Sequence, residues 1–257
     1  MSTITAAIIQ ARMGSSRLPG KVLLPLGERF VLEHIIRRVQ RAEEIDTVVV
    51  ATSTKTADDI IEWCGKQNNA VVFRGDEEHV LDRMHRAAVA VQANEVVRIT
   101  GDCPLISPAV IDRVVTRRRE AEADYASNIL TRTFPRGLDV EAFSRESFDR
   151  VRAGADTAAE FEHVTLRYRN GQGGFDTLNI SSEEVFDEYW LQDRTDLRLT
   201  LDELADYLLL RTVFENVEYN HSPSFSNVVR YIDEEALAEV NASVAQKKAH
   251  DEVRDQG

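Results

Sequence analysis

The 257-residue sequence lacks the features of membrane proteins and of disulfide-rich secreted proteins. It contains no run of 18 apolar residues, which excludes a transmembrane helix. Its first residues, MSTITAAIIQ, lack the basic and long apolar stretches of a signal peptide. It has only two cysteines, Cys64 and Cys103, so neither a disulfide framework nor a zinc site is expected. We therefore expect a cytoplasmic protein that does not bind membranes.

Positive charge is also scarce. The chain has 31 Lys and Arg against 44 Asp and Glu, a formal net charge of −13. Such a surface repels polyanions, so we expect no binding to nucleic acid. No internal repeat or low-complexity linker divides the chain, and 43% of its residues are hydrophobic. This length and composition predict a single domain over residues 1–257 with one sizeable core.

Short apolar runs alternate with amphipathic segments through the first half of the chain. The apolar runs predict strands at residues 5–10, 46–52, 70–75 and 95–100. The segments that follow them predict helices at residues 31–42, 57–67, 76–93 and 107–121. Four strand–helix units in succession predict an α/β fold with a mostly parallel sheet and right-handed crossovers.

This alternation stops at about residue 124. Residues 124–193 mix short strand-like runs with a helix-like segment and a Gly-rich loop, which predicts an inserted α+β subdomain with antiparallel strands. After the insert, LRLT at 197–200 predicts a further strand, and a long helix follows it. A last helical stretch is expected at 233–248, with a frayed polar end.

The motif IIQARMGSSRLPGK directly follows the first predicted strand. In an open parallel sheet, ligands bind at the carboxyl ends of the strands. Gly14 and Ser15 let the backbone approach a ligand, and Arg12, Arg17 and Lys21 can neutralise a triphosphate. The spacing matches neither the P-loop nor the dinucleotide fingerprint. The alternative is a solvated basic turn.

Several motifs together resemble one family. They are IIQARMGSSRLPGKVLLPL, FRGDEEHVLDRMHRAA, VVRITGDCPLISP, EHVTLRYRN and LRLTLDELADY, and the likeness extends over nearly residues 4–215. In this order they resemble the cytidylyltransferases that activate acidic sugars, such as the synthetases of CMP-acylneuraminate and CMP-3-deoxy-manno-octulosonate. The branch of the spore-coat polysaccharide protein SpsF is the most similar.

The resemblance implies a fold, a reaction and an assembly. The fold is a GT-A-like nucleotidyltransferase fold, a Rossmann-type α/β/α sandwich with a small dimerisation insert. The reaction is Mg²⁺-dependent transfer of CMP from CTP to an acidic sugar for surface polysaccharide, with release of pyrophosphate. The assembly is a homodimer. Aromatic residues of the insert are expected at its interface, namely Phe134, Phe143, Phe161, Tyr168 and Phe175.

The resemblance also assigns the nucleotide site. It implies catalytic contacts to the CTP phosphates from Arg12, Arg17 and Lys21, with Asp102 as a further catalytic residue. Around the base, ribose and phosphates it implies Gln10, Ala11, Met13, Gly14, Ser15, Arg74, Gly75, Asp82 and Arg83. The alternative for Asp82 and Arg83 is an ordinary charged helix surface.

Asp102 and Asp202 are the candidate metal ligands. Asp102 lies in TGDCP at the end of a predicted strand, and Asp202 lies in LRLTLDE after another. Mg²⁺ prefers carboxylate and phosphate oxygens, so two carboxylates meeting at one sheet edge can hold it. The alternatives are a turn-capping role for Asp102 and a helix N-cap role for Asp202. Asp206 is expected at the surface, and Cys103 as a packed residue without nucleophilic function.

The insert is expected to carry the acceptor site. The candidates are Asn128, Arg136, Asp139, Glu141 and His163, with Arg136 suited to a carboxylate or phosphate. Asp139 and Glu141 alternate along a predicted strand and can instead form its solvent face. The alternative for His163 is a place in the dimer interface.

Two other functions are consistent with part of this pattern. A GT-A glycosyltransferase would use a nucleotide sugar, but such enzymes usually carry Asp-x-Asp where this chain has Gly-Asp-Cys-Pro at 101–104. A non-catalytic nucleotide-binding protein would not need Arg12, Lys21, Asp102 and Asp202 together. The sequence therefore favours nucleotidyl transfer and leaves the acceptor sugar open.

Overall fold

The computed structural model describes residues 3–217 and 223–245. Within them, a seven-stranded sheet has the order β5-β4-β1-β6-β8-β7-β9. Its strands are β1 (Thr5–Gln10), β4 (Thr47–Ser53), β5 (Val71–Gly75), β6 (Glu95–Thr100), β7 (Tyr125–Ser127), β8 (Glu141–Ser144) and β9 (Thr177–Asn179). The four strands predicted for the first half pair in parallel, because each returns through a helix. Strand β8 runs antiparallel to both β6 and β7.

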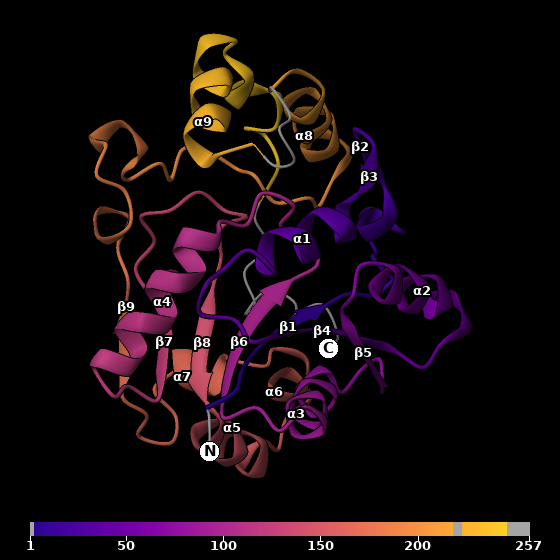
Figure 1. Cartoon of the computed structure of the whole chain (residues 1–257), viewed down its shortest axis with the longest axis vertical. Helices are drawn as coiled ribbons and strands as arrows, with labels where there is room; N and C mark the ends of the chain where they lie inside the picture. The colour runs from indigo at the N-terminus through magenta and orange to yellow at the C-terminus, as the bar shows by residue number, and fades with distance from the viewer. Residues whose placement is uncertain (1–2, 218–222, 246–257) are drawn as a thin grey trace.

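Helices cover both faces of this sheet (Figure 1). One face packs against α1 (Val31–Val39), α2 (Asp59–Gln67) and α4 (Pro108–Glu120), and α8 (Leu204–Asn216) and α9 (Phe225–Glu234) extend the same core above α1 in Figure 1. The other packs against α3 (Val80–Ala90), α5 (Arg145–Gly154), α6 (Ala158–Glu162) and α7 (Leu166–Arg169). Along β1, Ala7 and Ile9 enter the first core while Ala6 and Ile8 enter the second. The predicted α/β/α sandwich is confirmed.

Shorter elements connect these layers. They are the two-stranded sheet of β2 (Pro25–Leu26) and β3 (Arg29–Phe30) and the 3₁₀ helices η1 (Lys21–Leu23), η2 (Thr56–Asp58), η3 (Ser182–Glu184), η4 (Tyr189–Leu191) and η5 (Leu237–Val240). No helix among the described residues is long and apolar enough to cross a membrane.

The segment expected to be an insert extends the main sheet. Strands β7, β8 and β9 form its far edge, and β8 lies between β6 and β7. This pairing places Glu141 beside Arg98 of β6. Strands β7, β8 and β9 of residues 124–193 therefore belong to the same sheet as β1, which leads into the loop that carries Arg12, and the use of this segment in dimerisation stays a prediction.

The aromatic residues assigned to a dimer interface lie mostly inside the chain's own core. Phe134 and Phe143 are fully buried and Tyr168 is 1% exposed. Tyr168 stacks on Tyr125 with ring centroids 4.7 Å apart. Expecting these three side chains at an interface was wrong, because Phe143 and Tyr168 lie in the core that includes Phe148 of α5, and Phe134 packs against Phe186 in the other core.

Two secondary-structure predictions near the C-terminus were also wrong. Residues 197–200 form no strand and make only an isolated bridge between Arg136 and Arg198. The last α-helix is α9, which begins after Ser224, whose side chain accepts a hydrogen bond from the Asn227 N–H. Helix α9 ends at Glu234, near the start of the helix predicted at 233–248. Among the described residues after Glu234, only η5 lies within the predicted range. Residues 246–248 of that prediction lie outside the described part.

Candidate active site

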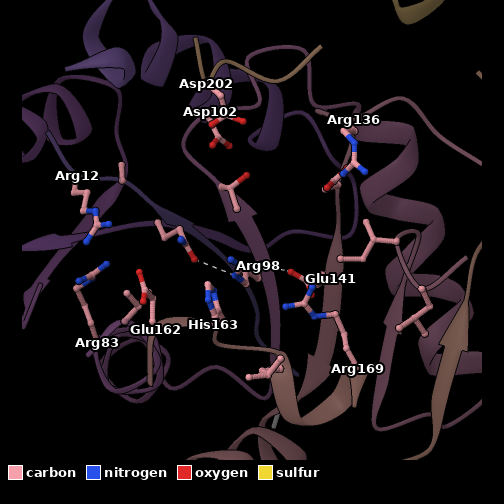
Figure 2. A pocket seen from close by; sticks show the side chains of 18 of the residues that line it. Arg12, Arg83, Arg98, Asp102, Arg136, Glu141, Glu162, His163, Arg169 and Asp202 are labelled. Carbon is pink, nitrogen blue, oxygen red and sulfur yellow. Dashed lines mark hydrogen bonds and ion pairs between the residues drawn. The ribbon is translucent and has the colours of Figure 1, made fainter. Parts of the chain in front are cut away.

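A cavity of about 820 Å³ opens at the carboxyl ends of β1 and β6 (Figure 2). Its lining is dominated by charge, in contrast to the apolar lining of most ligand pockets. Among the described residues, it includes the arginines Arg12, Arg17, Arg83, Arg98, Arg132, Arg136 and Arg169. It also includes the carboxylates Asp102, Asp139, Glu141, Glu162 and Asp202. A chain with net charge −13 therefore concentrates its cations around one cavity.

The loop after β1 forms one wall of this cavity. Gln10, Ala11 and Arg12 line it, and Asp58 fixes the turn behind them by accepting a hydrogen bond from the Met13 N–H at 2.7 Å. Gly101 permits the close approach of the two strand ends, because a Cβ there would lie 2.8 Å from the Gln10 carbonyl oxygen. Arg12 makes no hydrogen bond or ion pair with the part of the chain that the structure describes. Its guanidinium is therefore available to an anion.

Arg83 reaches the same wall from α3. It is 2% exposed and donates to the backbone carbonyls of Asp76 and Glu77. Gly75 makes room for it, because a Cβ on Gly75 would lie 2.9 Å from the Arg83 Cγ. Burial and then the nearby Arg12 lower the pKa of Arg83 to about 10. A bound anion would relieve the repulsion between Arg12 and Arg83, which lie on the same side of the cavity (Figure 2).

Other residues expected at the nucleotide site lie elsewhere. Arg74 points away from the cavity and binds the carboxylates of Asp59 and Glu62 at 2.6 and 2.8 Å. Asp82 accepts a hydrogen bond from Arg152 at 2.8 Å. Met13, Gly14 and Ser15 belong to the loop but do not line the cavity.

Asp102 and Asp202 meet at the top of the cavity (Figure 2). The Lys21 Nζ lies between them, 2.9 Å from the Asp102 Oδ2 and 2.8 Å from the Asp202 Oδ1. Burial by itself would raise the pKa of Asp102, but Lys21 and the hydroxyl of Thr100 outweigh it and lower that pKa to about 2. Both of the expected metal ligands are thus brought together, and Asp102 is ionised at neutral pH.

A loop carries Asp202 to this position. The Leu201 N–H donates to the Asp102 carbonyl oxygen at 2.8 Å, and the Leu199 N–H donates to the Arg136 carbonyl oxygen at 2.7 Å. Gly137 allows this crossing with a φ of 104°, since a Cβ there would lie 2.4 Å from the Leu199 carbonyl carbon. The expectation that Asp202 ends a strand was wrong, although its convergence with Asp102 does not depend on a strand.

Asp206 caps helix α8. It is fully buried, and its carboxylate accepts hydrogen bonds from the N–H groups of Asp202 and Glu203 at 2.9 Å each. Expecting Asp206 at the surface was wrong. Glu203 is the N-cap residue, so the helix-cap alternative for Asp202 does not hold. Asp202 instead contacts Arg17 and Arg198, at 2.9 and 2.8 Å.

Cys103 is buried beside this cluster. Burial and then Asp102 raise the pKa of its thiol well above the usual value. The thiol is therefore protonated at neutral pH, in agreement with a packing role.

Two of the residues predicted to bind the acceptor, Asn128 and Asp139, are held by hydrogen bonds to other residues of the chain. The amide of the fully buried Asn128 holds the Leu138 carbonyl and the Val140 N–H, at 2.8 and 2.9 Å, and does not line the cavity. Asp139 is bound in a bidentate pair by Arg132, at 2.7 and 2.9 Å. Expecting Asn128 as a ligand therefore conflicts with its buried hydrogen bonds.

Glu141 is 2% exposed, so the solvent-face alternative is wrong for it. One carboxylate oxygen accepts from the Tyr125 and Thr165 hydroxyls, at 2.7 and 2.6 Å, and the other accepts from Arg98. Both oxygens are engaged, so Glu141 fixes its neighbours and offers no free oxygen for a ligand.

Arg136 and His163 both line the cavity, Arg136 on the side away from Arg12 and His163 near the middle, below Arg98 in Figure 2. The Arg136 side chain makes no ion pair with any described residue, and burial and then Arg132 lower its pKa. Figure 2 shows Arg136 and Arg169 across the cavity from Arg12 and Arg83. The cavity therefore has two cationic walls with the pair Asp102 and Asp202 between them.

The sequence model of one protein family, described as Cytidylyltransferase, matches residues 6–173. The chain belongs to the cytidylyltransferase family. It is a CTP-dependent nucleotidyltransferase, which the cations around the cavity suit, and the alternative of a glycosyltransferase is set aside.

Relatives and solved structures agree with this assignment. The chain is 34% identical over 231 residues to the spore coat polysaccharide biosynthesis protein SpsF of Bacillus subtilis, covering 88% of this chain and 92% of that protein. It is 35% identical over 109 residues to the 3-deoxy-manno-octulosonate cytidylyltransferase of Trichlorobacter lovleyi, 42% of each chain. A cytidylyltransferase structure from Leptospira borgpetersenii superimposes with a TM-score of 0.85 at 27% identity, covering 96% of this chain and all of that one.

Sequence reasoning missed several cavity residues of this cytidylyltransferase. Arg98 is the clearest, because it lies at the cavity floor and its Nε donates to the Gln10 side-chain oxygen at 3.0 Å. The available signal was a single charge inside the apolar run EVVRIT. Arg132 and Arg169 gave no such signal, since they come from loop and helix-end positions where arginine is common.

Proposed function

We propose that this cytidylyltransferase transfers CMP from CTP to an acidic sugar used in surface polysaccharide, with pyrophosphate as the second product. The observation that carries the proposal is the pair of opposed cationic walls, where Arg12 and Arg136 lie on opposite sides of Asp102 and Asp202 and neither side chain forms an ion pair with a described residue. One wall suits a triphosphate and the other suits an anionic acceptor. The names of the relatives from Bacillus subtilis and Trichlorobacter lovleyi support the same pathway and substrate class.

Arg12, Arg17, Lys21 and Arg83 are the residues that would hold the triphosphate. Nucleotidyl transfer puts negative charge on the oxygens around the α-phosphorus and on the departing pyrophosphate. Guanidinium groups bind such oxygens in pairs, while the lysine contributes a mobile point charge. Catalysis then consists of aligning the acceptor oxygen with the α-phosphorus and neutralising the leaving group.

Asp102 and Asp202 fit a magnesium ion by their chemistry. Each offers a carboxylate oxygen to one shared cation, the Lys21 ammonium, at 2.9 and 2.8 Å. No group of three or more acidic, histidine or cysteine side chains among the described residues could hold a metal. Mg²⁺ commonly binds through one or two carboxylates, with phosphate and water completing its shell. When bound, Mg²⁺ would supply Lewis-acid stabilisation of the phosphate oxygens.

Arg136 is the group best placed to select an acidic acceptor. Its guanidinium lines the cavity without an ion-pair partner among the described residues, whereas the nearby Arg132 is bound by Asp139. A partly buried cation without a partner among the described residues favours a carboxylate over a neutral hydroxyl, because only the carboxylate adds an opposite charge and can accept two parallel N–H bonds from the guanidinium. His163 also lines the cavity and is a second candidate for the acceptor site.

Pyrophosphate release tests this function directly. The enzyme, Mg²⁺ and each of the four nucleoside triphosphates are combined with a panel of acidic sugars and their neutral analogues. We expect release only with CTP and an acidic acceptor. Equal release with a neutral analogue would remove the acidic-sugar assignment, and a preference for ATP or GTP would remove the cytidine assignment.

Arg136→Met separates the acceptor wall from the nucleotide wall. We expect the KM for the acidic acceptor to rise at least about 10-fold while the KM for CTP changes little, because one charge-assisted contact contributes about 1.5–3 kcal/mol. Arg86→Met, at a 64% exposed arginine side chain on α3, is the matched control. An unchanged KM for the acceptor in Arg136→Met would contradict the assignment of Arg136 to the acceptor site.

We also propose that the chain works as a cytoplasmic homodimer. Buried free thiols at Cys64 and Cys103 suit a reducing compartment. Leu204 and Leu208, one turn apart on α8, are 62% and 40% exposed and offer apolar surface to a second copy. Light scattering is expected to give about twice the chain mass of 29.0 kDa, and a monomer at micromolar concentration would remove the dimer.

A further inference from the structure

The Lys21 ammonium is held between the two carboxylates proposed to bind metal. It lies 2.9 Å from the Asp102 Oδ2 and 2.8 Å from the Asp202 Oδ1, and its side chain is only 13% exposed. Its backbone begins η1, where the Lys21 N–H donates to the Leu18 carbonyl at 3.2 Å. The lysine therefore neutralises both acids from a fixed point on the nucleotide loop.

Further cations saturate Asp202. Arg17 contacts the same oxygen as Lys21, at 2.9 Å, and Arg198 contacts the other oxygen at 2.8 Å. A magnesium ion lies 2.0–2.1 Å from its ligand oxygens, closer than an ammonium nitrogen. An ion bridging the same two oxygens would overlap the position of the Lys21 Nζ. Metal and lysine therefore exclude each other at this pair.

We propose that Lys21 has a second role as a removable blocker of the metal site, which excludes free divalent metal until a triphosphate attracts the lysine away. This inference rests on the proposed function, because it takes Asp102 and Asp202 as the metal pair. A triphosphate at Arg12 and Arg17 carries about four negative charges and offers the Lys21 ammonium an alternative partner. As the lysine moves to the phosphates, the two ionised carboxylates lose their shared counter-ion and become able to bind metal.

Such an exchange couples the two ligands thermodynamically. If the triphosphate raises metal affinity by removing Lys21, metal must raise triphosphate affinity by the same factor. The enzyme would then bind metal and nucleotide together and would hold little metal alone. A lysine suits this exchange better than an arginine, because its single charge sits on a flexible stem.

Binding of Mn²⁺ measured by electron paramagnetic resonance tests this role without any catalytic turnover. Free Mn²⁺ is titrated into wild type, Lys21→Met, Lys21→Arg and Lys66→Met. Lys66 is the matched control, a 63% exposed lysine side chain paired with Glu62 far from the cavity. We expect Lys21→Met to bind free Mn²⁺ at least about 10-fold more tightly than wild type, while Lys21→Arg and Lys66→Met resemble wild type.

Adding CTP completes the test. Bound Mn²⁺ is counted beyond the Mn²⁺–CTP complex measured without protein. CTP is expected to increase metal affinity strongly in wild type and only slightly in Lys21→Met. Melting curves give a second readout, in which Mg²⁺ alone stabilises Lys21→Met but not wild type. Lys21→Gln, which is neutral but can still donate to the acids, replaces Lys21→Met if that variant fails to fold.

Two outcomes overturn the inference in distinguishable ways. If wild type binds free Mn²⁺ as tightly as Lys21→Met, the blocking role is wrong while the metal pair stands. If no variant binds Mn²⁺ with or without CTP, the metal pair of the proposed function is wrong and the blocking role falls with it.

Discussion

Replacing Glu141 by glutamine removes one charge from a buried cluster with almost no change in volume. The carboxylate is 2% exposed and accepts from Arg98, from the Tyr125 hydroxyl at 2.7 Å and from the Thr165 hydroxyl at 2.6 Å. The glutamine amide must turn its NH₂ group either toward Arg98, where it repels, or toward two hydroxyls that then lose their acceptor. Either orientation leaves the Arg98 charge without a counter-ion.

The expected loss in unfolding free energy is about 3 kcal/mol. Breaking a buried pair costs about 3–5 kcal/mol, and the lower end applies because Arg98 borders the open cavity. For a chain of this size, 1 kcal/mol corresponds to about 2–4 °C, so the melting temperature should fall by about 6–12 °C. Tyr125→Phe and Thr165→Val each remove one hydrogen bond to this carboxylate and should cost about 1.5 kcal/mol, the lower end for a bond to a charged group.

Urea unfolding followed by circular dichroism measures all three variants. Glu120→Gln is the matched control, because the Glu120 side chain is 56% exposed and its pair with Arg117 should contribute less than about 1 kcal/mol. A Glu141→Gln loss below 1 kcal/mol, combined with a raised acceptor KM, would show that Glu141 acts as a substrate ligand and would refute this reasoning.

Three further perturbations have defined outcomes. Burial lowers the pKa of His34 from 6.5 to about 4, so the fold keeps its full stability above pH 6.5, where the ring is neutral, and loses about 3 kcal/mol as the pH falls to 4. His34→Gln should flatten that part of the curve of unfolding free energy against pH, and parallel curves for the variant and wild type would contradict this expectation. Gly137→Ala should lower the unfolding free energy measured in urea by at least 2 kcal/mol, whereas Gly171→Ala, with open space around its Cβ, should lower it by about 1 kcal/mol. Equal losses would contradict the proposed clash with Leu199. Asp206→Ala should lose at least about 2 kcal/mol of unfolding free energy, because the N–H groups of Asp202 and Glu203 and the Arg198 guanidinium lose their acceptor, and an unchanged melting temperature would contradict this role.

Periodicity predicted the first half of the fold because its strands are buried on both faces. Val48 and Val50 enter one core while Val49 enters the other, so an uninterrupted apolar run could only be a central strand. The far edge of the sheet was harder. Strands β7 and β9 have three residues each, which is too short for a clear period. Their place in the main sheet depends on pairing with β8, a contact between distant segments.

In the candidate site, too, the sequence located residues that follow a local pattern and did not locate residues whose position depends on distant contacts. Residues on the loop after β1 and in TGDCP could be located from local pattern, since strand ends meet at one edge. Asp206 could not, because its burial depends on Arg198 and Asn241, which reach its carboxylate at 2.9 and 2.8 Å. Asn128 was expected to bind the acceptor because the sequence does not distinguish a loop asparagine that binds a ligand from one that binds two backbone groups.

The position of β8 between β6 and β7 bears on how acceptor preference can be re-engineered. Backbone hydrogen bonds join the strands behind the proposed nucleotide wall and the proposed acceptor wall into one continuous sheet, with Arg98 in register with Glu141 and Tyr125 in register with Phe143. A chimera whose crossover point falls inside these strands would break that register. Crossover points in the loops at 128–140 and 170–176 would instead exchange acceptor-facing residues while retaining the shared framework. Grafting loops from relatives with other acceptors onto this chain is therefore a more promising route to new sugar nucleotides than exchanging whole halves.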